Sequence, residues 1–324
     1  MKKIARAHTN IALIKYWGKQ NAALRIPLMS SLSMTLDAFY TDTYLEPSQQ
    51  EQFYLNGKLI EGPEAQRVFN YLHLLQRRYG KSGNLSVHSQ NHVPTAAGLA
   101  SSSSAFAALA AAFAEYYQLA VNETELSRMA RLGSGSASRS VFGGFAVWQK
   151  GTDDQSSFAY SLDSNPDLDL QLLAVEINTG AKKRSSTKGM QAAQTSPFFA
   201  PWIKRNSLEL SQMINAIKNH DFTRIGQLAE LNASEMHAVN LTAQPGFTYF
   251  EPTTIGVIQL VHEMRQNGIE VYYTIDAGPN VKLLCQLKNV KIVKEKLVSA
   301  FDHVKIINAS FGPGIQYLDN YELD

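Results

Sequence analysis

The stretch PTAAGLASSSSA, from Pro94 to Ala105, carries the clearest chemical signal in the sequence. Gly98 lets the backbone approach a ligand closely, and an alanine-rich helix is expected to begin just after it, where backbone N–H groups point outward. Serine hydroxyls add donors of little volume. The pattern predicts a phosphate-binding turn, and the alternative is a helix start capped by a single serine. The candidate phosphate-binding residues of this turn are Pro94, Gly98, Leu99, Ala100, Ser101, Ser102, Ser103 and Ser104.

This turn matches neither of the common nucleotide-binding loops. No Gly-Lys-Ser or Gly-Lys-Thr follows it, as a Walker A loop requires, and it lacks the G-x-G-x-x-G of dinucleotide-binding domains. P-loop and dinucleotide-binding folds are therefore disfavoured.

Asp276 is the candidate for acid–base chemistry. It follows an expected strand, and Gly278 and Pro279 after it predict a sharp turn that would present the carboxylate at a sheet edge. On the residues alone, the commoner explanation of Asp-Ala-Gly-Pro is a turn residue that bonds its own backbone. Both explanations stay open at this stage.

Arg139 is the candidate for binding an anion. Its small neighbours leave room for a guanidinium to bind a carboxylate or phosphate through a charge-assisted fork. These neighbours are Ser134, Ser136, Ala137, Ser138 and Ser140. The alternative is a surface ion pair, which stabilises a protein by less than ~1 kcal/mol.

Lys15, Tyr16 and Lys19 form a third group, with two cations and a phenol donor close to small residues. Without further support, such a group is most often part of a solvated edge strand. His88 and His92 straddle an expected strand end rather than sharing a helix face, so a metal site there is disfavoured.

Hydrophobic periodicity and turn residues predict the elements that must position these side chains. Asn56-Gly57 predicts a hairpin within 53–60, Pro63 and Gly80 bound a helix, and Asn122 with Glu125 predicts a helix start. Further strands are expected at 4–8, 31–36, 41–45, 85–87, 144–149, 170–177, 270–275, 281–286, 304–307 and 315–318. Further helices are expected at 103–117, 186–196, 198–219, 222–239, 253–267 and 290–301. Strands and helices follow one another along the chain without strict alternation, which indicates an α+β fold.

The composition excludes several classes of protein. At 324 residues the chain is long enough for two domains. Thirty Lys and Arg against 28 Asp and Glu give a net charge of +2, too small and dispersed for a nucleic-acid partner. No segment approaches the ~18 apolar residues of a membrane helix, so no membrane partner is expected.

Cysteine usage and the N-terminal residues bear on the compartment. The single cysteine, Cys285, excludes an internal disulfide framework and is expected to be a core residue. Lys15 and Lys19 interrupt the apolar residues near the N-terminus before a signal peptide can form. We therefore expect a cytoplasmic protein.

Five motifs together resemble one family. Pro-x-x-x-Gly-Leu followed by a small residue and serines is similar to the ATP-phosphate loop of the GHMP small-molecule kinase superfamily. HTNIALIKYWGK at 8–19, GSGSASRSVFGGF at 133–145, SSTKGM at 185–190 and IDAGPNVK at 275–282 resemble the mevalonate diphosphate decarboxylase family more specifically.

This resemblance implies the two-domain α+β fold of the GHMP kinases. The N-terminal domain, expected at 1–180, would be ribosomal-protein-S5-like and carry the ATP-phosphate loop. The C-terminal domain, expected at 181–324, would be ferredoxin-like, with the active-site cleft between the two. A homodimer is also a family expectation.

The resemblance also assigns roles to the candidate residues. Asp276 would contact the tertiary 3-hydroxyl of the substrate, as general base or as its orienting partner, and Lys15 would balance charge beside it. Arg139 would orient the substrate carboxylate. Ser186, or Ser185 if the alignment slips by one, would reach toward the transferred phosphoryl group. The substrate diphosphate would be bound by Tyr16, Lys19, Ser134 and Ser136.

The implied reaction is ATP-dependent decarboxylation of (R)-mevalonate 5-diphosphate to isopentenyl diphosphate. Mg²⁺ would be held through the ATP phosphates and Ser102 or Ser103. Mevalonate-kinase-like relatives carry a catalytic acid in the stretch that corresponds to 133–144, which has no Asp or Glu here. Two alternatives stay open: a 3-kinase or decarboxylase that acts on mevalonate or its monophosphate, and a catalytically silent fold that binds nucleotide or a protein partner.

Overall fold

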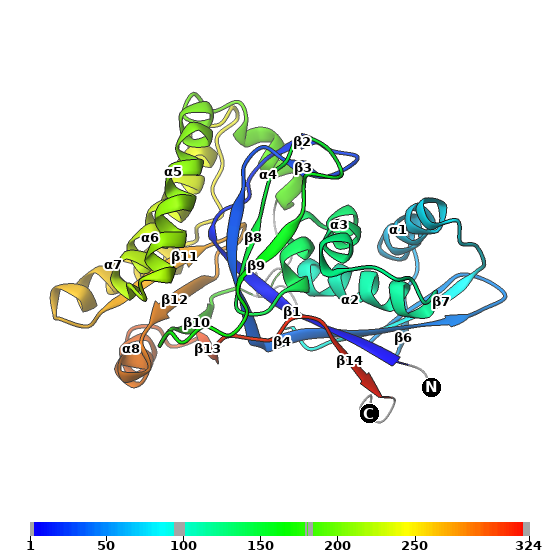
Figure 1. Cartoon of the computed structure of the whole chain (residues 1–324). Coiled ribbons are helices and arrows are strands. Elements are labelled where there is room, and N and C mark those ends of the chain that lie inside the picture. Colours follow the sequence, from blue (N-terminus) through cyan, green and yellow to red (C-terminus); the bar gives the residue numbers. More distant parts are fainter. Residues whose placement is uncertain (1–2, 94–100, 179, 181–183, 320–324) are drawn as a thin grey trace.

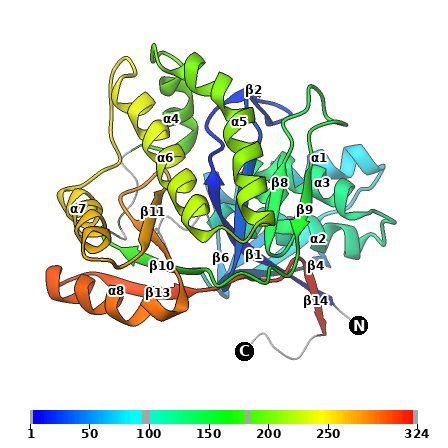
Figure 2. The same ribbon diagram turned by 60° about the vertical axis from the view of Figure 1, so that its left-hand side comes forward.

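Two β-sheets, each with its own helices, organise the chain (Figures 1 and 2). The structure is a computed structural model that describes residues 3–93, 101–178, 180 and 184–319. Figure 1 shows the helices of the first sheet on the right and the second sheet with helices α5 to α8 on the left.

The first sheet is antiparallel for the most part and eight-stranded within the described residues, with the path β14-β1-β4-β7-β5-β6 and with β8 joining β4 to β9. Its strands are β1 (Lys3–Ile14), β4 (Ser31–Pro47), β5 (Gln52–Leu55), β6 (Lys58–Leu59), β7 (Leu85–Asn91), β8 (Phe145–Trp148), β9 (Ala159–Asp163) and β14 (Gln316–Asp319). A short separate pair is formed by β2 (Lys19–Asn21) and β3 (Ile26–Pro27).

Three α-helices and one 3-10 helix accompany the first sheet: α1 (Pro63–Tyr79), α2 (Ser101–Tyr116), α3 (Glu123–Gly133) and η1 (Gly135–Val141). Pro63 starts α1 and Gly80 ends it in the left-handed conformation at φ 61°, as expected from the sequence. Asn122 caps α3 by accepting a hydrogen bond from the Glu125 N–H, which confirms that start. The alanines of α2 from Ala107 onward are buried, so neighbouring elements approach this helix closely.

The second sheet has the order β11-β12-β10-β13, and all its neighbours are antiparallel. Its strands are β10 (Gln171–Glu176), β11 (Val271–Ile275), β12 (Val281–Cys285) and β13 (Lys305–Ala309). Its helices are α4 (Ser186–Ala193), α5 (Phe199–Lys218), α6 (Phe222–Leu241), α7 (Pro252–Gln266) and α8 (Leu287–Ala300). Cys285 is buried in this core, as expected.

A shared core joins the two halves. It contains Ile11, Leu32 and Phe145 of the first sheet, Leu172 and Leu284 of the second, and Met213 and Leu228 of α5 and α6. Strand β10 pairs in the second sheet although it precedes residue 180, and β14 returns to the first sheet near the end of the chain. The division into domains at residue 180 stays a prediction.

Three expectations about the elements were wrong. Residues 31–47 form one continuous strand in place of the two strands expected at 31–36 and 41–45, and its pairing with β1 shifts register between His8 and Asn10. The strand expected at 4–8 extends to Ile14. The helix η1 and strand β9 were not expected, because their short stretches of small or mixed residues carry no clear period.

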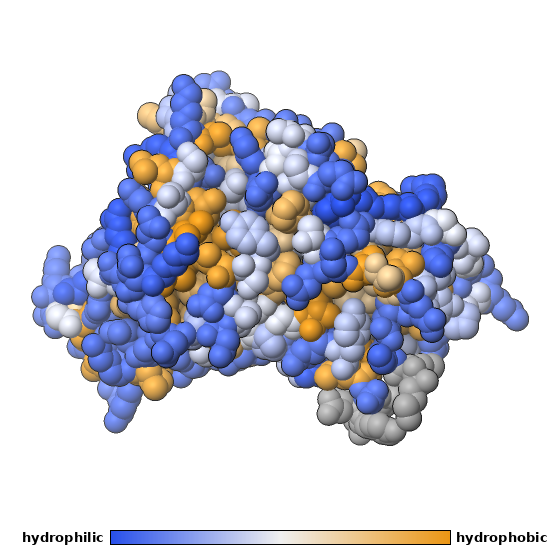
Figure 3. All heavy atoms as spheres, in the orientation of Figure 1, coloured by the Kyte–Doolittle hydropathy of each residue, from blue (hydrophilic) through white to orange (hydrophobic). Residues whose placement is uncertain are grey.

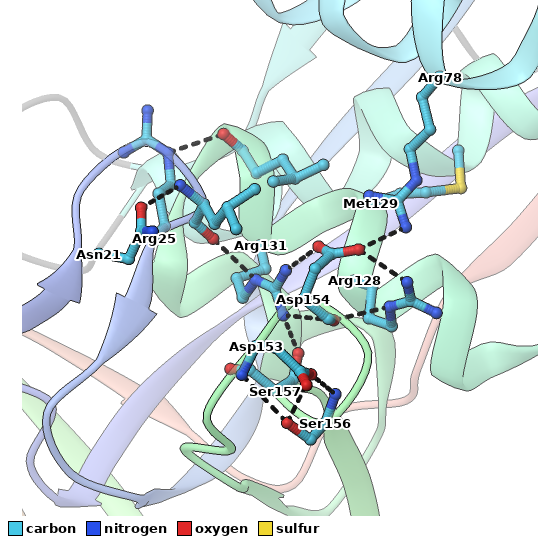
Figure 4. Close-up of polar contacts among 12 residues, drawn as sticks. Asn21, Arg25, Arg78, Arg128, Met129, Arg131, Asp153, Asp154, Ser156 and Ser157 are labelled. Atoms are coloured by element: carbon cyan, nitrogen blue, oxygen red, sulfur yellow. Dashed lines mark hydrogen bonds and ion pairs between the residues drawn. The ribbon is translucent and has the colours of Figure 1, made fainter.

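A cluster of arginines around Asp154 fixes the turn after β8 to helices α1 and α3 (Figure 4). Asp154 accepts hydrogen bonds from Arg78 at 2.8 Å and Arg128 at 2.7 Å, and it contacts the fully buried Arg131. Burial alone would raise the pKa of Asp154, but the hydrogen bonds and charges of these arginines lower it to about 2. Arg131 also bonds the Leu24 carbonyl, so the cluster supports the loop after Lys19.

We expect Asp154→Asn to lower the free energy of unfolding by about 3 kcal/mol at neutral pH, because it leaves a buried guanidinium without its carboxylate. Urea unfolding followed by circular dichroism measures this loss. Asp153→Asn is the matched control, since the exposed Asp153 carboxylate bonds residues of its own turn, chiefly Ser156, rather than the arginine cluster. Equal losses in the two variants would contradict the assigned role of the cluster.

The surface gives no sign of a membrane-spanning segment in the part that the structure describes. None of its helices is both long and apolar enough to cross a bilayer. On the face shown in Figure 3, hydrophilic residues predominate and hydrophobic residues form separate patches.

Candidate active site

Asp276 and Lys15 form an ion pair between the two halves of the chain. Lys15 follows β1 and is 1% exposed, and its Nζ lies 2.7 Å from Asp276 Oδ1 and 2.8 Å from the Ala12 carbonyl oxygen. Asp276 follows β11, and a second buried ammonium, Lys282 Nζ, lies 3.8 Å from its Oδ2. Because its carboxylate pairs across the fold with Lys15, Asp276 is more than a turn residue that bonds its own backbone.

Arg139 is buried in η1 and held by two side chains of the first sheet. Its Nε and Nη2 donate to Asn10 Oδ1 at 3.3 and 3.2 Å, and its Nη1 donates to Ser31 Oγ. Asn10 is fixed in turn by donating to the Ser136 carbonyl and to Ser140 Oγ. A guanidinium has five N–H groups, so each terminal nitrogen of Arg139 keeps one for a ligand.

The charges of Arg139, Asp276 and Lys15 lie close enough to affect one another. Burial lowers the pKa of Arg139 to about 10, and the charge of Asp276 opposes this shift. Burial also lowers the pKa of Lys15, Asp276 opposes that shift, and Arg139 adds to it. The Asp276 carboxylate and the Arg139 guanidinium therefore lie in one region, and the charges of both act on Lys15.

Tyr16 lies against Gly135, which Ser134 and Ser136 flank in the chain. The Tyr16 hydroxyl is buried and has no hydrogen-bond partner among the described residues, while its ring packs edge-on against Trp148 at 4.7 Å. A Cβ at Gly135 would lie 3.0 Å from this hydroxyl, so only glycine allows the close approach. Ser134 Oγ lies 3.4 Å from Ser136 Oγ. The unpaired phenol beside two hydroxyls suits a ligand rich in acceptor oxygens.

Three cations lie together near Ser134. Arg25 Nε bonds the Leu132 carbonyl at 2.7 Å, and Arg67 Nη2 bonds the Gly133 carbonyl at 3.4 Å, so both arginines reach the end of α3 (Figure 4 labels Arg25). Burial, followed by the charges of Arg25 and Arg67, lowers the pKa of Lys19. Arg25 and Arg67 line a cavity of about 440 Å³. A concentration of like charge beside serine hydroxyls is typical of a polyanion site.

The serine turn leads into α2 as expected, although Pro94, Gly98, Leu99 and Ala100 lie outside the described residues. Ser101 is exposed and Ser102 half-buried, whereas Ser103 and Ser104 are fully buried. Ser104 Oγ lies 2.8 Å from Thr41 Oγ1, and Ser102 Oγ lies 3.2 Å from Ser134 Oγ. This second contact joins the start of α2 to the group around Tyr16.

Ser185 and Ser186 differ in what they do. Ser185 caps α4 by accepting a hydrogen bond from the Lys188 N–H at 3.3 Å, and it is exposed. Ser186 is the first residue of the helix and half-buried. Among the cations near these serines, Arg184 lies over the Phe247 ring at 4.4 Å, while Lys182 and Lys183 lie outside the described residues.

The described residues fit a magnesium ion that ATP would bring. Among them, no group of three or more His, Cys, Asp or Glu is placed to hold a metal. Mg²⁺ commonly binds substrate phosphates and only one or two protein oxygens. The accessible Ser102 hydroxyl at the start of α2 is a donor of that kind. His88 stacks between Tyr44 and Tyr54 at 4.6 and 4.8 Å, so its ring has a packing role.

Sequence reasoning missed the residues that hold the site from a distance. Asn10 and Lys282 lie inside motifs that were singled out, but nothing local indicates that they support Arg139 and Asp276. Ser31, Arg25 and Arg67 carry no local signal, because their partners lie between 66 and 108 positions away in the chain.

Two carboxyl groups lie beneath the site, between α5 and α6. Glu235 faces Glu209, Arg205 and the Trp202 indole of α5, and its Oε2 is buried without a hydrogen-bond partner among the described residues. Burial, followed by the charge of Glu209, raises the pKa of Glu235 to about 7. Glu235 therefore keeps its proton to a higher pH than an ordinary carboxyl group.

This shift makes stability depend on pH with a definite sign. A folded-state pKa of about 7 against an ordinary 4.5 means that the folded protein binds the proton more tightly, so stability falls as pH rises through this interval. We expect Glu235→Gln to flatten that fall and to be more stable than the unmodified protein near pH 8. Urea unfolding near pH 5.5 and near pH 8 measures it. Glu295→Gln, at an exposed position on α8, is the control, and parallel pH curves for all three proteins would contradict the raised pKa of Glu235.

Comparison with known proteins gives a consistent result over the whole chain. The model "Diphosphomevalonate decarboxylase-like N-terminal domain" matches residues 7–159, and "Mevalonate 5-diphosphate decarboxylase C-terminal domain" matches residues 172–316. The diphosphomevalonate decarboxylase of Candida albicans is 36% identical and is matched over 96% of each chain.

Solved structures indicate the same family as the family models and the curated relative. The mevalonate diphosphate decarboxylase of Staphylococcus aureus is 44% identical, with a TM-score of 0.94 over 98% of each chain. A structure described as "MDDEF in complex with MVAPP, AMPPCP and Magnesium" is also 44% identical, with a TM-score of 0.93 over 99% of each chain. These similarities confirm the expected two-domain α+β fold of the GHMP kinases. The chain belongs to the mevalonate diphosphate decarboxylase family.

Proposed function

We propose that this chain catalyses the ATP-dependent decarboxylation of (R)-mevalonate 5-diphosphate to isopentenyl diphosphate, ADP, phosphate and carbon dioxide. The observation that carries the proposal is the Lys15–Asp276 ion pair across the fold, beside the buried guanidinium of Arg139. An acceptor for a hydroxyl proton and a fork for a carboxylate are the two groups that a branched 3-hydroxy acid requires. Family membership supports the same activity.

The substrate diphosphate binds where hydroxyls and cations gather. Tyr16, Ser134 and Ser136 supply neutral donors, and Lys19 supplies charge, with Arg25 and Arg67 close by. ATP binds at the serine turn, where Ser101 is exposed and Ser102 is half-buried at the start of α2. The contact between Ser102 and Ser134 brings the two phosphate sites together. The bound Mg²⁺ neutralises charge on the phosphates.

In the first step, the 3-oxygen of the substrate attacks the γ-phosphorus of ATP and ADP leaves. Asp276 accepts the hydrogen bond of the 3-hydroxyl, as its general base or its orienting partner, and Lys15 holds the carboxylate in position. Ser186 reaches the phosphoryl group from α4. Phosphorylation turns the 3-oxygen into a good leaving group.

In the second step, the bond between C3 and its oxygen breaks and phosphate leaves with the electron pair. The electrons of the C1–C2 bond then form the C2–C3 double bond, and carbon dioxide leaves. Arg139 orients the carboxylate through its two remaining N–H groups, in a buried position where water does not compete for the charge.

We expect Ser186→Ala to lower kcat by about 10-fold to 100-fold, in line with the loss of one donor to a transferring group. Steady-state assays of ADP release measure this effect. Ser185→Ala is the matched control, because the Ser185 hydroxyl caps α4. It is expected to lower stability by about 1 kcal/mol and to leave kcat near that of the unmodified protein. The reverse pattern would assign the catalytic hydroxyl to Ser185.

One assay tests the proposed function against its alternatives. The protein is incubated with ATP, Mg²⁺ and, in turn, mevalonate, its 5-phosphate and its 5-diphosphate, and carbon dioxide and free phosphate are measured. We expect equal amounts of both from the diphosphate alone. A phosphorylated product without carbon dioxide would identify a 3-kinase, and no ADP from any substrate would identify a silent fold.

The oligomeric state and compartment belong to the same proposal. A homodimer follows from the family resemblance. A cytoplasmic location agrees with the cysteine usage, because the buried free thiol of Cys285 suits a reducing compartment. Light scattering coupled to gel filtration measures the mass in solution, and a mass of one chain would contradict the dimer.

A further inference from the structure

The backbone of Lys15 is held separately from its side chain, which pairs with Asp276. Its backbone N–H donates a buried hydrogen bond of 2.7 Å to Asn232 Oδ1 of α6. Two residues further along the chain, the Trp17 indole N–H donates to Asn240 Oδ1, also on α6, at 2.8 Å. The segment Lys15–Trp17 is therefore fastened to one helix at both ends.

The hydrogen bonds behind Asn232 have a fixed direction. A backbone N–H can only donate, so the oxygen of the Asn232 amide must face Lys15 and its NH₂ must face the other way. That NH₂ donates to Glu209 Oε2 at 2.6 Å, inside the protein. Glu209 must therefore accept, and its Oε1 accepts a second hydrogen bond from Arg205 Nε at 3.1 Å.

Burial gives this chain of contacts its importance. Asn232 is 0% exposed and Glu209 is 2% exposed. Reversing or removing one member leaves a buried donor or acceptor without a partner, which shifts the atoms at the other end. The residue at that other end is Lys15, whose ammonium lies 2.7 Å from Asp276.

Helix α6 also supports the strand that carries Asp276. His237 Nε2 lies 3.3 Å from the carbonyl oxygen of Ile275, the residue before Asp276. The two members of the ion pair thus come from distant parts of the chain and are both held by α6. Displacements of about 1 Å in such a pair are enough to cost about 100-fold in rate.

We propose that Asn232 and Glu209 are positioning residues that fix Lys15, and through it Asp276, for transfer of the phosphoryl group. The inference rests on the proposed function, because it concerns the same ion pair. Neither residue touches the substrate, so their effect is expected in kcat, with little change in the affinity for ATP.

An exchange of the two side-chain types tests this proposal. Asn232→Asp places a carboxylate against the carboxylate of Glu209. Glu209→Gln replaces one accepting oxygen by an NH₂ group. If this NH₂ faces Asn232, two donors meet, and if it faces Arg205, the hydrogen bond from Arg205 is lost. In the double variant, the carboxylate at position 232 accepts from the Lys15 N–H and from the amide NH₂ at position 209. The amide oxygen at position 209 still accepts from Arg205. All three hydrogen bonds and the net charge are then restored, and only the contact between positions 232 and 209 has its direction reversed.

We expect each single variant to lower kcat by about 10-fold to 100-fold and the double variant to recover to within about 3-fold of the unmodified protein. Asn232→Asp alone is also expected to regain activity as pH falls, because a proton shared with Glu209 removes the repulsion. The groups that face this position are Glu209 and Arg205 of α5, Glu235 of α6 and Lys15. Glu209→Gln introduces no such proton requirement, so its pH profile is expected to keep its shape.

Glu125→Gln is the matched control. Glu125 of α3 also pairs with an arginine, Arg128 of the same helix, at 2.7 Å, but no hydrogen bond or ion pair joins it to Lys15, α6 or β11 among the described residues. We expect it to lower the thermal midpoint without changing kcat. Should Asn232→Asp fail to fold, the comparison of kcat between Glu209→Gln and Glu125→Gln decides.

Two results would overturn the proposal: single variants with unchanged kcat, or a double variant as slow as the slower single one. Failure of the proposed function is distinguishable, because the unmodified protein would then release no carbon dioxide from mevalonate 5-diphosphate.

Discussion

Asp276→Asn is expected to lower kcat by about 10²–10⁴-fold while the affinity for ATP stays nearly constant. The amide keeps the size of the carboxylate but is a much weaker acceptor for the 3-hydroxyl proton. It also removes the negative charge that Lys15 contacts at 2.7 Å and Lys282 approaches at 3.8 Å. Single-turnover measurements of ADP formation with saturating mevalonate 5-diphosphate measure the first chemical step directly.

Two further measurements make this result interpretable. Both lysines are 1% exposed, so the variant is also expected to be less stable, and its thermal midpoint shows whether it is folded at the assay temperature. Nucleotide affinity, measured by calorimetry, shows whether the ATP site is intact. A folded variant with near-normal turnover would remove Asp276 from the mechanism.

Arg139→Lys is expected to lower kcat/KM for mevalonate 5-diphosphate by at least about 100-fold. Arg139 uses three N–H groups on Asn10 and Ser31, and two remain for the substrate carboxylate. A lysine ammonium has only three donors and no planar fork, so it cannot keep both sets of contacts. Each charge-assisted hydrogen bond that is lost costs about 1.5–3 kcal/mol, which sets the size of the effect.

Arg6→Lys is the matched control for this change. Arg6 makes a two-pronged pair with Asp42, at 2.7 and 2.8 Å, on strands β1 and β4. The same substitution there removes a fork of the same kind and is expected to affect stability alone. If Arg139→Lys keeps both substrate affinity and turnover, the guanidinium has only a structural role.

The helices were predictable because their signals are local. Pro63 and Gly80 bound α1, and Asn122 starts α3, since caps and turn residues act within a few positions of the chain. The long strand β4 was divided in error, because the break in its pairing is a bulge that only the partner strand β1 reveals. Pairing between distant strands leaves no local pattern in the sequence.

The residues of the candidate site also divide into those that the sequence predicts and those that only the fold reveals. Lys15, Arg139 and Asp276 lie in motifs and carry side chains whose chemistry is apparent from their type. Asn232 and Glu209 do not, because their importance comes from the buried contacts that link Lys15 to positions 217 and 194 residues further on. A buried asparagine on an amphipathic helix is indistinguishable in sequence from any other polar residue.

The central claim is that Asp276 and Arg139 contact opposite ends of one branched hydroxy acid beside the ATP phosphates. A crystal structure of the unmodified protein with mevalonate 5-diphosphate, a non-hydrolysable ATP analogue and Mg²⁺ tests it most directly. We expect the 3-hydroxyl oxygen at about 2.6–3.2 Å from an Asp276 carboxylate oxygen and the substrate carboxylate on the Arg139 guanidinium. A substrate bound with its 3-hydroxyl turned away from Asp276, or its carboxylate in solvent, would contradict the account.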